Sequence, residues 1–600
     1  MNNLAHFQDR ETAIAAFDHL WEASTPWILA FTGLSGQGKS TFLDWLEAKR
    51  CQANNLPYAL IGIGEYAAQI RGALDGMLDL STSNLRRHLP HESLRSYREK
   101  RAVALADRNR RHMALHQEQT MVGSVQGEQQ MSARLSEAYR EMEAQADEII
   151  FDAWLDCLEG LPDRTRLVLL LDNYDAFQDS AAIEMLRQFW QVLERTYSRV
   201  PGLRVVLASR EPIRHQNDIR AFHNGLADDA LLPLTAEDSS ALLVSMGVKD
   251  PAYRRAVFQN LAQGHPLVTR MAAEAWLETA GGIVADNVPR QVSREQAVEW
   301  VQGRILDRLT GPLKEAVRWA ALLRWFHADS LGAVINSRLT PDEFRALTRY
   351  AFVIRPRLAP QAWACHDLVR RVQMAYLQQE RPDAFQRFHE QARDFFRDRE
   401  EPFEALYHHF FLNQEEAFAG WQGMESQAAF AFDHASWAML MELGLAPELR
   451  LQPAMMAEVY YRSGRRHYYR AEWEQADDHL LQALERFNAI GDRLGQANVL
   501  QSLGKLHFGQ NEPESIQMGT KAFDEALALY RGIGDRVGQT NIYTFFSRWL
   551  ADRGQFGEAF KFGQQALALA QSFIPNHPFT EWLAQFVQAL GAEAGIEDTP

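Results

Sequence analysis

The chain has 600 residues, with 62 Lys and Arg against 78 Asp and Glu, and its formal net charge of -16 argues against nucleic-acid binding by the surface as a whole. This length exceeds what one hydrophobic core supports and predicts several domains, while Cys51, Cys157 and Cys365 share no metal or disulfide spacing and fit reduced thiols. The sequence starts without a basic-then-apolar leader, and no run reaches the roughly 18 apolar residues of a membrane span, so we expect a cytoplasmic protein without a membrane partner.

The first predicted elements are an amphipathic helix at 5–24, a buried strand at 27–31 and a helix at 41–49. Between the strand and the second helix lies Gly33-Leu34-Ser35-Gly36-Gln37-Gly38-Lys39-Ser40, which fits the phosphate-binding pattern G-x-x-x-x-G-K-[ST] in the context that the pattern requires. Backbone N–H groups and the helix dipole would hold a phosphate, Lys39 would reach the outer phosphates, and Ser40 would bind Mg²⁺. The residues predicted to bind the nucleotide here are Gly33, Ser35, Gly36, Gln37, Gly38, Lys39, Ser40 and Thr41.

A second short strand is predicted at 58–63, and residues 66–150 then read as a helical insertion. The Gln-rich, apolar-poor run at 117–130 predicts a mobile tip for this insertion. Basic residues crowd between positions 84 and 111: Arg86, Arg87, Arg95, Arg98, Lys100, Arg101, Arg108, Arg110 and Arg111. They indicate either a contact surface for nucleic acid or an acidic partner, or a solvated arm, since Glu and Asp are interspersed.

Two further apolar runs predict buried parallel strands, at 167–172 and 203–210. The first is a Walker B strand, because it ends in Asp172, a carboxylate that would hold Mg²⁺ beside the phosphates. Asn173 follows where many nucleotide-hydrolysing proteins carry a second acid, so we expect hydrolysis to be slow or to depend on Asp175. Arg210 would emerge at the same sheet edge and sense the γ-phosphate, the alternative being an arginine that only caps the strand. Lys39, Asp172, Asp175 and Arg210 are therefore the candidate catalytic residues.

The order of the remaining motifs resembles the STAND class of signalling P-loop ATPases, including its NB-ARC branch. The segments that carry the resemblance are Phe7-Gln8-Asp9-Arg10-Glu11, Gly264-His265-Pro266-Leu267 and Cys365-His366-Asp367-Leu368, with Cys365 where methionine is usual. It covers residues 7–372 outside the insertion. The resemblance implies that the first segment lies near the base, that Pro266 packs near the adenine, and that His366 contacts the β-phosphate of ADP and holds a closed, inactive arrangement. A solvent-facing histidine at a helix start is the alternative for His366.

The carboxyl-terminal third is predicted to be entirely helical. Aromatic residues at helical spacing mark a buried connector at 376–450. The heptapeptide Ile-Gly-Asp-Arg-Leu-Gly-Gln at 490–496 returns as Ile-Gly-Asp-Arg-Val-Gly-Gln at 533–539, and this part resembles tetratricopeptide repeats. The offset of 43 residues exceeds the usual period of about 34, so we expect a longer inter-helix loop at 509–514. The concave face of such a solenoid predicts a protein or peptide partner, and a plain scaffold packed on the ATPase is the alternative.

The expected fold is multidomain and mainly α, with one α/β domain. Its parts would be a P-loop NTPase domain with a parallel sheet at 1–230 including the insertion, the connector at 376–450 and an α-solenoid of tetratricopeptide-like repeats at 451–600. Between them, the resemblance to STAND ATPases implies a small helical domain at 231–300 and a winged-helix domain at 301–375.

These features predict a nucleotide-dependent molecular switch, closed with ADP and open with ATP and Mg²⁺, with slow ATPase activity. We expect a nucleotide-controlled oligomer whose effector is a separate chain, in bacterial signalling or antiviral defence. The alternatives are a DNA-associated, origin-recognition-like ATPase or transcription regulator that uses the basic insertion, and a passive repeat scaffold with a degenerate nucleotide site.

Overall fold

The computed structural model describes residue 7 and residues 10–596, except 23–25, 63–77, 80, 83–84, 122–127, 160, 162–165, 178–182, 215, 217–218, 357–360, 431–432, 470–471 and 511. The Gln-rich run predicted as a mobile tip falls partly outside the described residues. Contacts within the chain define two units. The first comprises Met1–Arg98, Phe151–Ser426 and His434–Leu440, and the second comprises Glu99–Ile150, Gln427–Asp433 and Met441–Pro600.

A five-stranded parallel sheet forms the centre of the α/β part. Its strands are β1 (Ile28–Thr32), β2 (Tyr58–Gly62), β3 (Leu167–Asp172), β4 (Leu203–Ser209) and β5 (Leu226–Ala230). They are arranged in the order β2-β3-β4-β1-β5, with every neighbouring pair parallel. The first four lie where apolar runs predict them, whereas the edge strand β5 was missed because its sequence, Leu-Ala-Asp-Asp-Ala, has little strand character.

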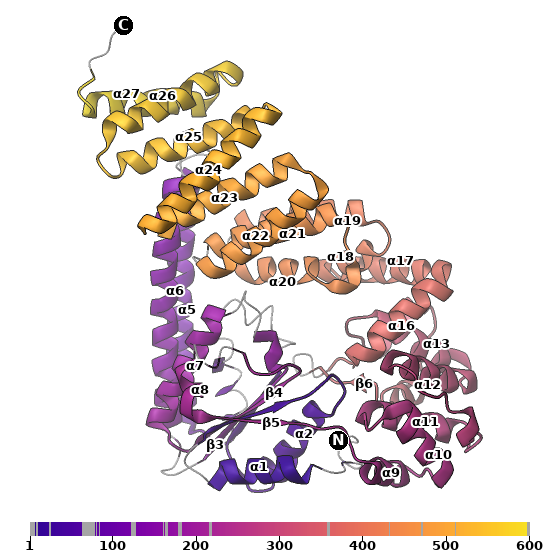
Figure 1. The fold of residues 1–600 in the computed structure, drawn as a ribbon. Coiled ribbons are helices and arrows are strands. Elements are labelled where there is room, and N and C mark those ends of the chain that lie inside the picture. Colours follow the sequence, from indigo (N-terminus) through magenta and orange to yellow (C-terminus); the bar gives the residue numbers. More distant parts are fainter. Residues whose placement is uncertain are drawn as a thin grey trace. The chain divides into compact units, whose positions relative to one another are not determined.

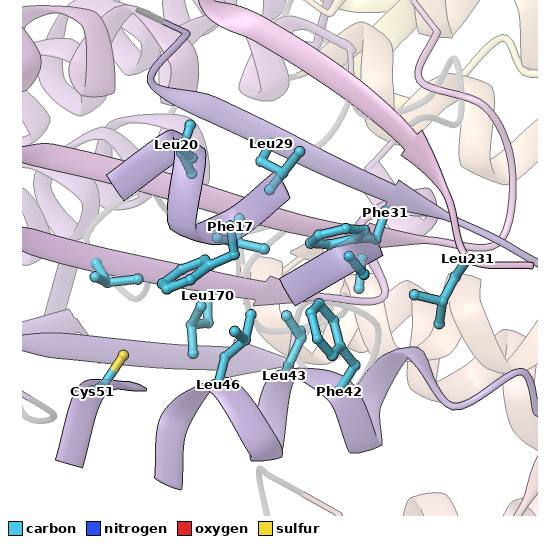
Figure 2. Packing of buried hydrophobic residues seen from close by; sticks show 14 residues of the cluster. Phe17, Leu20, Leu29, Phe31, Phe42, Leu43, Leu46, Cys51, Leu170 and Leu231 are labelled. Atoms are coloured by element: carbon cyan, nitrogen blue, oxygen red, sulfur yellow. The ribbon is translucent and has the colours of Figure 1, made fainter. Parts of the chain in front are cut away.

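Helices cover both faces of this sheet, as Figure 1 shows, with α1 (Glu11–Glu22) and α2 (Lys39–Leu46) on one side and α7 (Ile183–Arg199) on the other. Because side chains alternate along a strand, every second strand residue points towards α1 and α2. Phe31 on β1 and Leu170 on β3 meet Phe17 of α1 and Phe42 of α2 there, in the apolar cluster drawn in Figure 2. This packing anchors the segment between β1 and α2, which carries the phosphate-binding pattern.

Helices make up most of the remaining chain. In order they are η3 (Tyr174–Phe177) between β3 and α7, α8 (Arg220–Gly225) before β5, and then α9 (Ala236–Ser245), α10 (Pro251–Ala256), η5 (Val257–Ala262), α11 (Pro266–Glu278), η6 (Ala285–Asn287) and α12 (Arg294–Arg308). Side chains cap the starts of several: Thr235 accepts a backbone hydrogen bond at α9, Asp250 at α10 and Ser293 at α12. Such caps satisfy N–H groups that have no partner within the helix, which explains why these helices begin where they do.

A short two-stranded sheet follows, made of β6 (Val353–Ile354) and β7 (Ala364–Cys365) in antiparallel pairing. Its neighbours are α13 (Gly311–Trp319), η7 (Ala320–Leu322), α14 (Ala328–Val334) and α15 (Pro341–Leu347), and a bridge joins Phe326 to Trp363. Next come α16 (Asp367–Glu380), α17 (Pro382–Asp398), α18 (Pro402–Phe410), α19 (Gln414–Phe430), α20 (His434–Gly444) and η8 (Pro447–Leu449). Aromatic side chains at the predicted helical spacing are buried between α17 and α18, including Phe388, Phe396 and Tyr407.

The second unit contains a series of antiparallel helix pairs. These are α21 (Pro453–Tyr469) with α22 (Trp473–Ile490), α23 (Arg493–Gln510) with α24 (Pro513–Ile533), and α25 (Arg536–Ala551) with α26 (Phe556–Phe573), followed by α27 (Pro578–Glu593). Only two residues separate α23 from α24, so the longer loop expected at 509–514 is wrong. The 43-residue offset arises instead from long helices of 18 and 21 residues.

The repeated heptapeptide connects each helix pair to the next, and its residues determine how the helices end, begin and pack. Gly534 ends α24 at a φ of 76°, and the Asp535 carboxylate accepts hydrogen bonds from the first N–H groups of α25. Gly538 lies so close to the preceding repeat that an added Cβ would come within 2.4 Å of the Tyr530 ring. The motif therefore terminates one helix, starts the next and lets the two pack closely.

The described residues of the insertion include two long helices, α5 (His91–Met121) and α6 (Glu128–Glu159), and α6 continues beyond the predicted end of the insertion at 150. The side chain of Arg111 on α5 donates a hydrogen bond to Gln145 on α6. Asp107 forms ion pairs with Arg110 and Arg111 on α5 itself, at 3.4 and 2.8 Å. The partner helix α6 is strongly acidic, with nine Asp and Glu against two Arg. Within the part of the chain that the structure describes, no helix combines the length and the apolar character needed to cross a lipid bilayer.

Candidate nucleotide-binding site

The phosphate-binding pattern forms a tight loop between β1 and α2. Gly36 and Gly38 have φ values of 80° and 86°, which only glycine adopts without strain, and Gly38 immediately precedes Lys39, the first residue of α2. The Gly33 N–H donates to the Ser209 carbonyl at 3.1 Å, so the loop is tied to the end of β4. A loop of this shape at a helix N-terminus presents backbone N–H groups to an anion.

Lys39 is buried against its own loop, where its ammonium donates to the carbonyls of Gly33 and Leu34. Burial lowers the pKa of Lys39 to about 8, although the carboxylates of Asp175 and Asp172 act in the opposite direction. A phosphate would replace the carbonyls as the partner of this ammonium and would favour its charged form. The phosphate-binding role that the sequence predicts for Lys39 stays a prediction.

Two oxygen donors suited to Mg²⁺ lie at the ends of the neighbouring elements. Asp172 closes β3 and is only 2% exposed, and its Oδ1 accepts the Asn173 N–H at 3.0 Å. Ser40 is exposed in the first turn of α2. Mg²⁺ prefers carboxylate and hydroxyl oxygens, so these two residues have the chemistry of its ligands, and their binding of the ion stays a prediction.

Asp175 is engaged in a way that its sequence position does not reveal. Its Oδ1 accepts the Arg210 backbone N–H at 2.9 Å, and its Oδ2 accepts the Arg210 Nε–H at 2.6 Å. Burial lowers the pKa of the arginine, but the adjacent carboxylate outweighs burial, and the net pKa of Arg210 is raised. In this arrangement each oxygen of Asp175 accepts one hydrogen bond from Arg210, and the carboxylate holds the arginine in place.

His366 and Asp367 reach the same region from the start of α16. The His366 imidazole caps this helix by accepting the Leu368 N–H at 3.3 Å. Its pKa is lowered chiefly by burial and further by the nearby cations of Lys39 and Arg210. Asp367 lies 3.8 Å from the Arg210 guanidinium. A residue from α16 is therefore close enough to respond to charge changes at the loop and at the end of β4.

The Gly264-His265-Pro266 turn also contacts the loop, through a residue that the sequence reasoning did not single out. Pro266 is the first residue of α11, and the preceding His265 places its Nε2 2.8 Å from the Ser35 carbonyl oxygen. The sequence did contain a signal for His265. Proline favours the first position of a helix, so Pro266 identifies the residue before it as the N-cap. The adenine contact expected of Pro266 stays a prediction.

Arg10, from the Phe7–Glu11 segment, braces the loop from another side. Its guanidinium donates to the carbonyls of Gln37 and Leu232, both at 2.7 Å, and the side chain is buried. Gln37 in turn accepts the Leu34 N–H at 3.2 Å through its side-chain oxygen. The position of this segment at the loop is explained by these bonds, and its proximity to a nucleotide base stays a prediction.

The structure thus brings together, in the first unit, residues that are far apart in the sequence. They are the loop at 33–41, Asp172, Asp175, Arg210, His265, Pro266 and His366. Among the residues described, no group of three or more His, Cys, Asp or Glu side chains forms a preassembled metal cluster. A two-ligand Mg²⁺ site completed by phosphates is the usual arrangement for nucleotide enzymes.

Comparisons with known proteins give little further guidance. No protein-family model matches the sequence, and no curated protein matches it. Among solved structures, one match is a Signal Transduction ATPase with Numerous Domains (STAND) protein with a tetratricopeptide repeat sensor from Pyrococcus horikoshii. It is 12% identical to this chain, with a TM-score of 0.35, and the alignment covers 98% of this chain and 85% of that one. Values this low carry no argument about function.

Proposed function

We propose that this protein is a nucleotide-dependent molecular switch of the STAND class, closed with ADP and released by ATP with Mg²⁺. The observation that carries the proposal is the approach of α16 to the end of β4, next to the phosphate loop: Asp367 lies 3.8 Å from Arg210, and the cation of Lys39 contributes to the lowered pKa of His366. One structural element outside the sheet is therefore electrostatically coupled to the residues that would bind phosphates.

The charges suggest how two nucleotides would be told apart. A ligand shifts a conformational equilibrium only through contacts that differ between the states. The additional phosphate of ATP would attract Arg210 and repel Asp367, and so would weaken the ion pair that links β4 to α16. ADP leaves that pair intact and lets His366 face the β-phosphate. The switch would then act through Arg210, Asp367 and His366.

The elements around α16 support this assignment. The order from α13 through the Phe326–Trp363 bridge, α14, α15, β6 and β7 is helix, strand, helix, helix, strand, strand. We assign this segment to a winged-helix domain at 301–375, after a small helical domain at 231–300 and the NTPase domain at 1–230. The paired helices after 451 would sense or recruit a protein partner, since stacked helix pairs present extended binding surfaces. A slow ATPase, a nucleotide-controlled oligomer, and a separate effector chain in signalling or defence complete the proposal.

The alternative of a DNA-associated ATPase depends on the basic insertion. Asp107 already pairs with Arg110 and Arg111, and α6 supplies acidic residues beside the basic helix α5. These internal partners favour the solvated-arm interpretation, so the switch is the function we put forward. Loss of salt-dependent DNA binding on replacing Arg108, Arg110 and Arg111 would reverse this preference.

The decisive experiment is a calorimetric titration of ADP and of ATP with Mg²⁺ into the wild-type chain and the Lys39→Ala variant. We expect binding by the wild type and its loss in the variant, because the ammonium is the one charged group within the loop. Lys249→Ala, which removes an exposed lysine of the same unit, is the matched control and should bind normally. Equal affinities of wild type and Lys39→Ala would refute the site. Mass photometry with ADP and with a non-hydrolysable ATP analogue then tests the switch, which requires different oligomer populations.

A further inference from the structure

The His265 side chain links the start of α11 to the phosphate loop. It is 4% exposed, its Nδ1 accepts the Val268 N–H at 3.4 Å, and its Nε2 lies 2.8 Å from the Ser35 carbonyl oxygen. Burial lowers the pKa of His265 to about 4, so the ring is neutral and carries a single proton at physiological pH. Because Nδ1 accepts a hydrogen bond, that proton is on Nε2, which donates to Ser35.

A second bond lies directly beside the first. The Leu267 N–H, in the first turn of α11, donates to the Gly36 carbonyl at 3.3 Å. The imidazole also lies close to the loop: a Cβ added to Gly36 would come within 2.4 Å of the His265 Cε1 atom. Two consecutive carbonyls of the loop are therefore held by the beginning of one helix.

The planarity of the peptide bond gives this contact a consequence for phosphate binding. In a trans peptide the C=O of one residue and the N–H of the next point in opposite directions. A hydrogen bond that holds the Ser35 carbonyl against α11 therefore turns the Gly36 N–H away from α11. The next amide, that of Gln37, is already used within the loop, where it donates to the Leu34 carbonyl at 3.2 Å.

We propose that His265 is a positioning residue for the nucleotide phosphates, which aims the Gly36 N–H into the loop by holding the Ser35 carbonyl. The inference rests on the proposed nucleotide site and deepens it, because it identifies the connection through which α11 responds to the ligand. Coupling between two sites is reciprocal. A phosphate that orders the loop therefore strengthens the hold of His265 and Leu267, and α11 becomes more protected when nucleotide binds.

Two substitutions separate the two bonds of the imidazole. His265→Asn keeps a short side-chain acceptor for the start of α11 but ends too early to reach Ser35. His265→Gln is longer and carries an N–H donor that reaches towards the carbonyl. We expect the Kd for ADP to rise about tenfold in His265→Asn, the worth of one hydrogen bond in a buried site, and about threefold in His265→Gln.

The control is His577→Asn, because His577 caps α27 in the second unit in the same manner, accepting the Phe579 N–H at 3.1 Å. Its ADP affinity should equal that of the wild type. Hydrogen exchange measured by mass spectrometry distinguishes positioning from a purely structural role. A purely structural role of His265 would not change how exchange in α11 responds to ADP. In the wild type, ADP should slow exchange both in the loop peptide and in the peptide of α11, whereas in His265→Asn it should slow exchange in the loop alone.

The outcomes are distinguishable. If the wild type binds ADP but exchange in α11 does not respond, the inference is overturned without any variant being needed. Equal ADP affinities of His265→Asn and wild type would overturn it as well. If the wild type binds neither ADP nor ATP, the proposed function fails, and the positioning role fails with it.

Discussion

Two histidines buried between α17 and α18 make the stability of the connector depend on pH. The Nδ1 atoms of His389 and His408 lie 2.8 Å apart, both side chains are fully buried, and the rings of Phe385, Phe396 and Phe411 surround them. One imidazole donates its Nδ1 proton to the other, and burial favours the neutral form of both rings. Burial lowers the pKa of His389 to about 3 and lowers that of His408 as well, and the cations of Arg370 and Arg324 add to this effect.

The sign and size of the effect follow from proton linkage. The folded-state pKa values lie below the ordinary value of about 6.5, so below that pH the unfolded state binds more protons than the native state. Stability is complete above about pH 6.5 and falls as the solution becomes more acidic. Between pH 7 and pH 5 this linkage costs about 2 kcal/mol for His389, and His408 changes the stability in the same direction. The contribution of His389 alone corresponds to a change of about thirtyfold in the opening equilibrium.

Hydrogen exchange of peptides from α17 and α18, corrected for the intrinsic pH dependence of exchange, measures this opening directly. The wild type should lose most of its protection there between pH 7 and pH 5. The double variant His389→Phe/His408→Phe keeps an aromatic ring at both positions and removes both titrating groups. It should show nearly constant protection, because replacing both partners of a buried hydrogen bond by apolar groups is close to neutral.

His409→Phe, which changes the neighbouring histidine on the same helix, serves as the control and should retain the pH dependence of the wild type. The reasoning is refuted if the wild type and the double variant lose protection in parallel as the pH falls.

Three further substitutions test the site and the repeats. Gly36→Ala places a methyl group against the His265 imidazole at a position whose φ is 80°, and should weaken ADP binding at least tenfold in calorimetry. The control Gly303→Ala adds a methyl group in open space and should leave ADP binding unchanged. Asp175→Asn loosens the arginine at the end of β4 and should raise the Kd for ATP about fivefold relative to that for ADP, as expected for a half-exposed ion pair; equal changes for both nucleotides would contradict this. Gly538→Ala inserts a methyl group into the ring of the preceding repeat and should destabilise the repeats by about 1 to 3 kcal/mol in urea unfolding, whereas the open Gly532→Ala should be tolerated.

Local pattern was sufficient for the parts of this protein whose structure is decided by neighbouring residues. The octet at 33–40 predicted the loop, because glycine spacing and the following lysine determine the backbone conformation and the charge together. Apolar runs predicted β1 to β4 and placed Asp172 at a strand end. The repeated heptapeptide predicted where helices stop and restart after residue 451, since glycine and aspartate act on the helix in which they occur.

Tertiary structure alone decided the contacts between distant segments. The strand β5 is a strand because β1 offers it a partner, whatever its own composition prefers. Asp175 reads as a free acid in the sequence, yet its carboxylate belongs to Arg210, 35 residues away. His265 is unremarkable in a helix-start motif and becomes a loop contact only when α11 packs against Ser35. Sequence pattern encodes periodicity and backbone freedom over a few residues, whereas the partner of a polar side chain depends on which elements the fold brings within 3 Å of it.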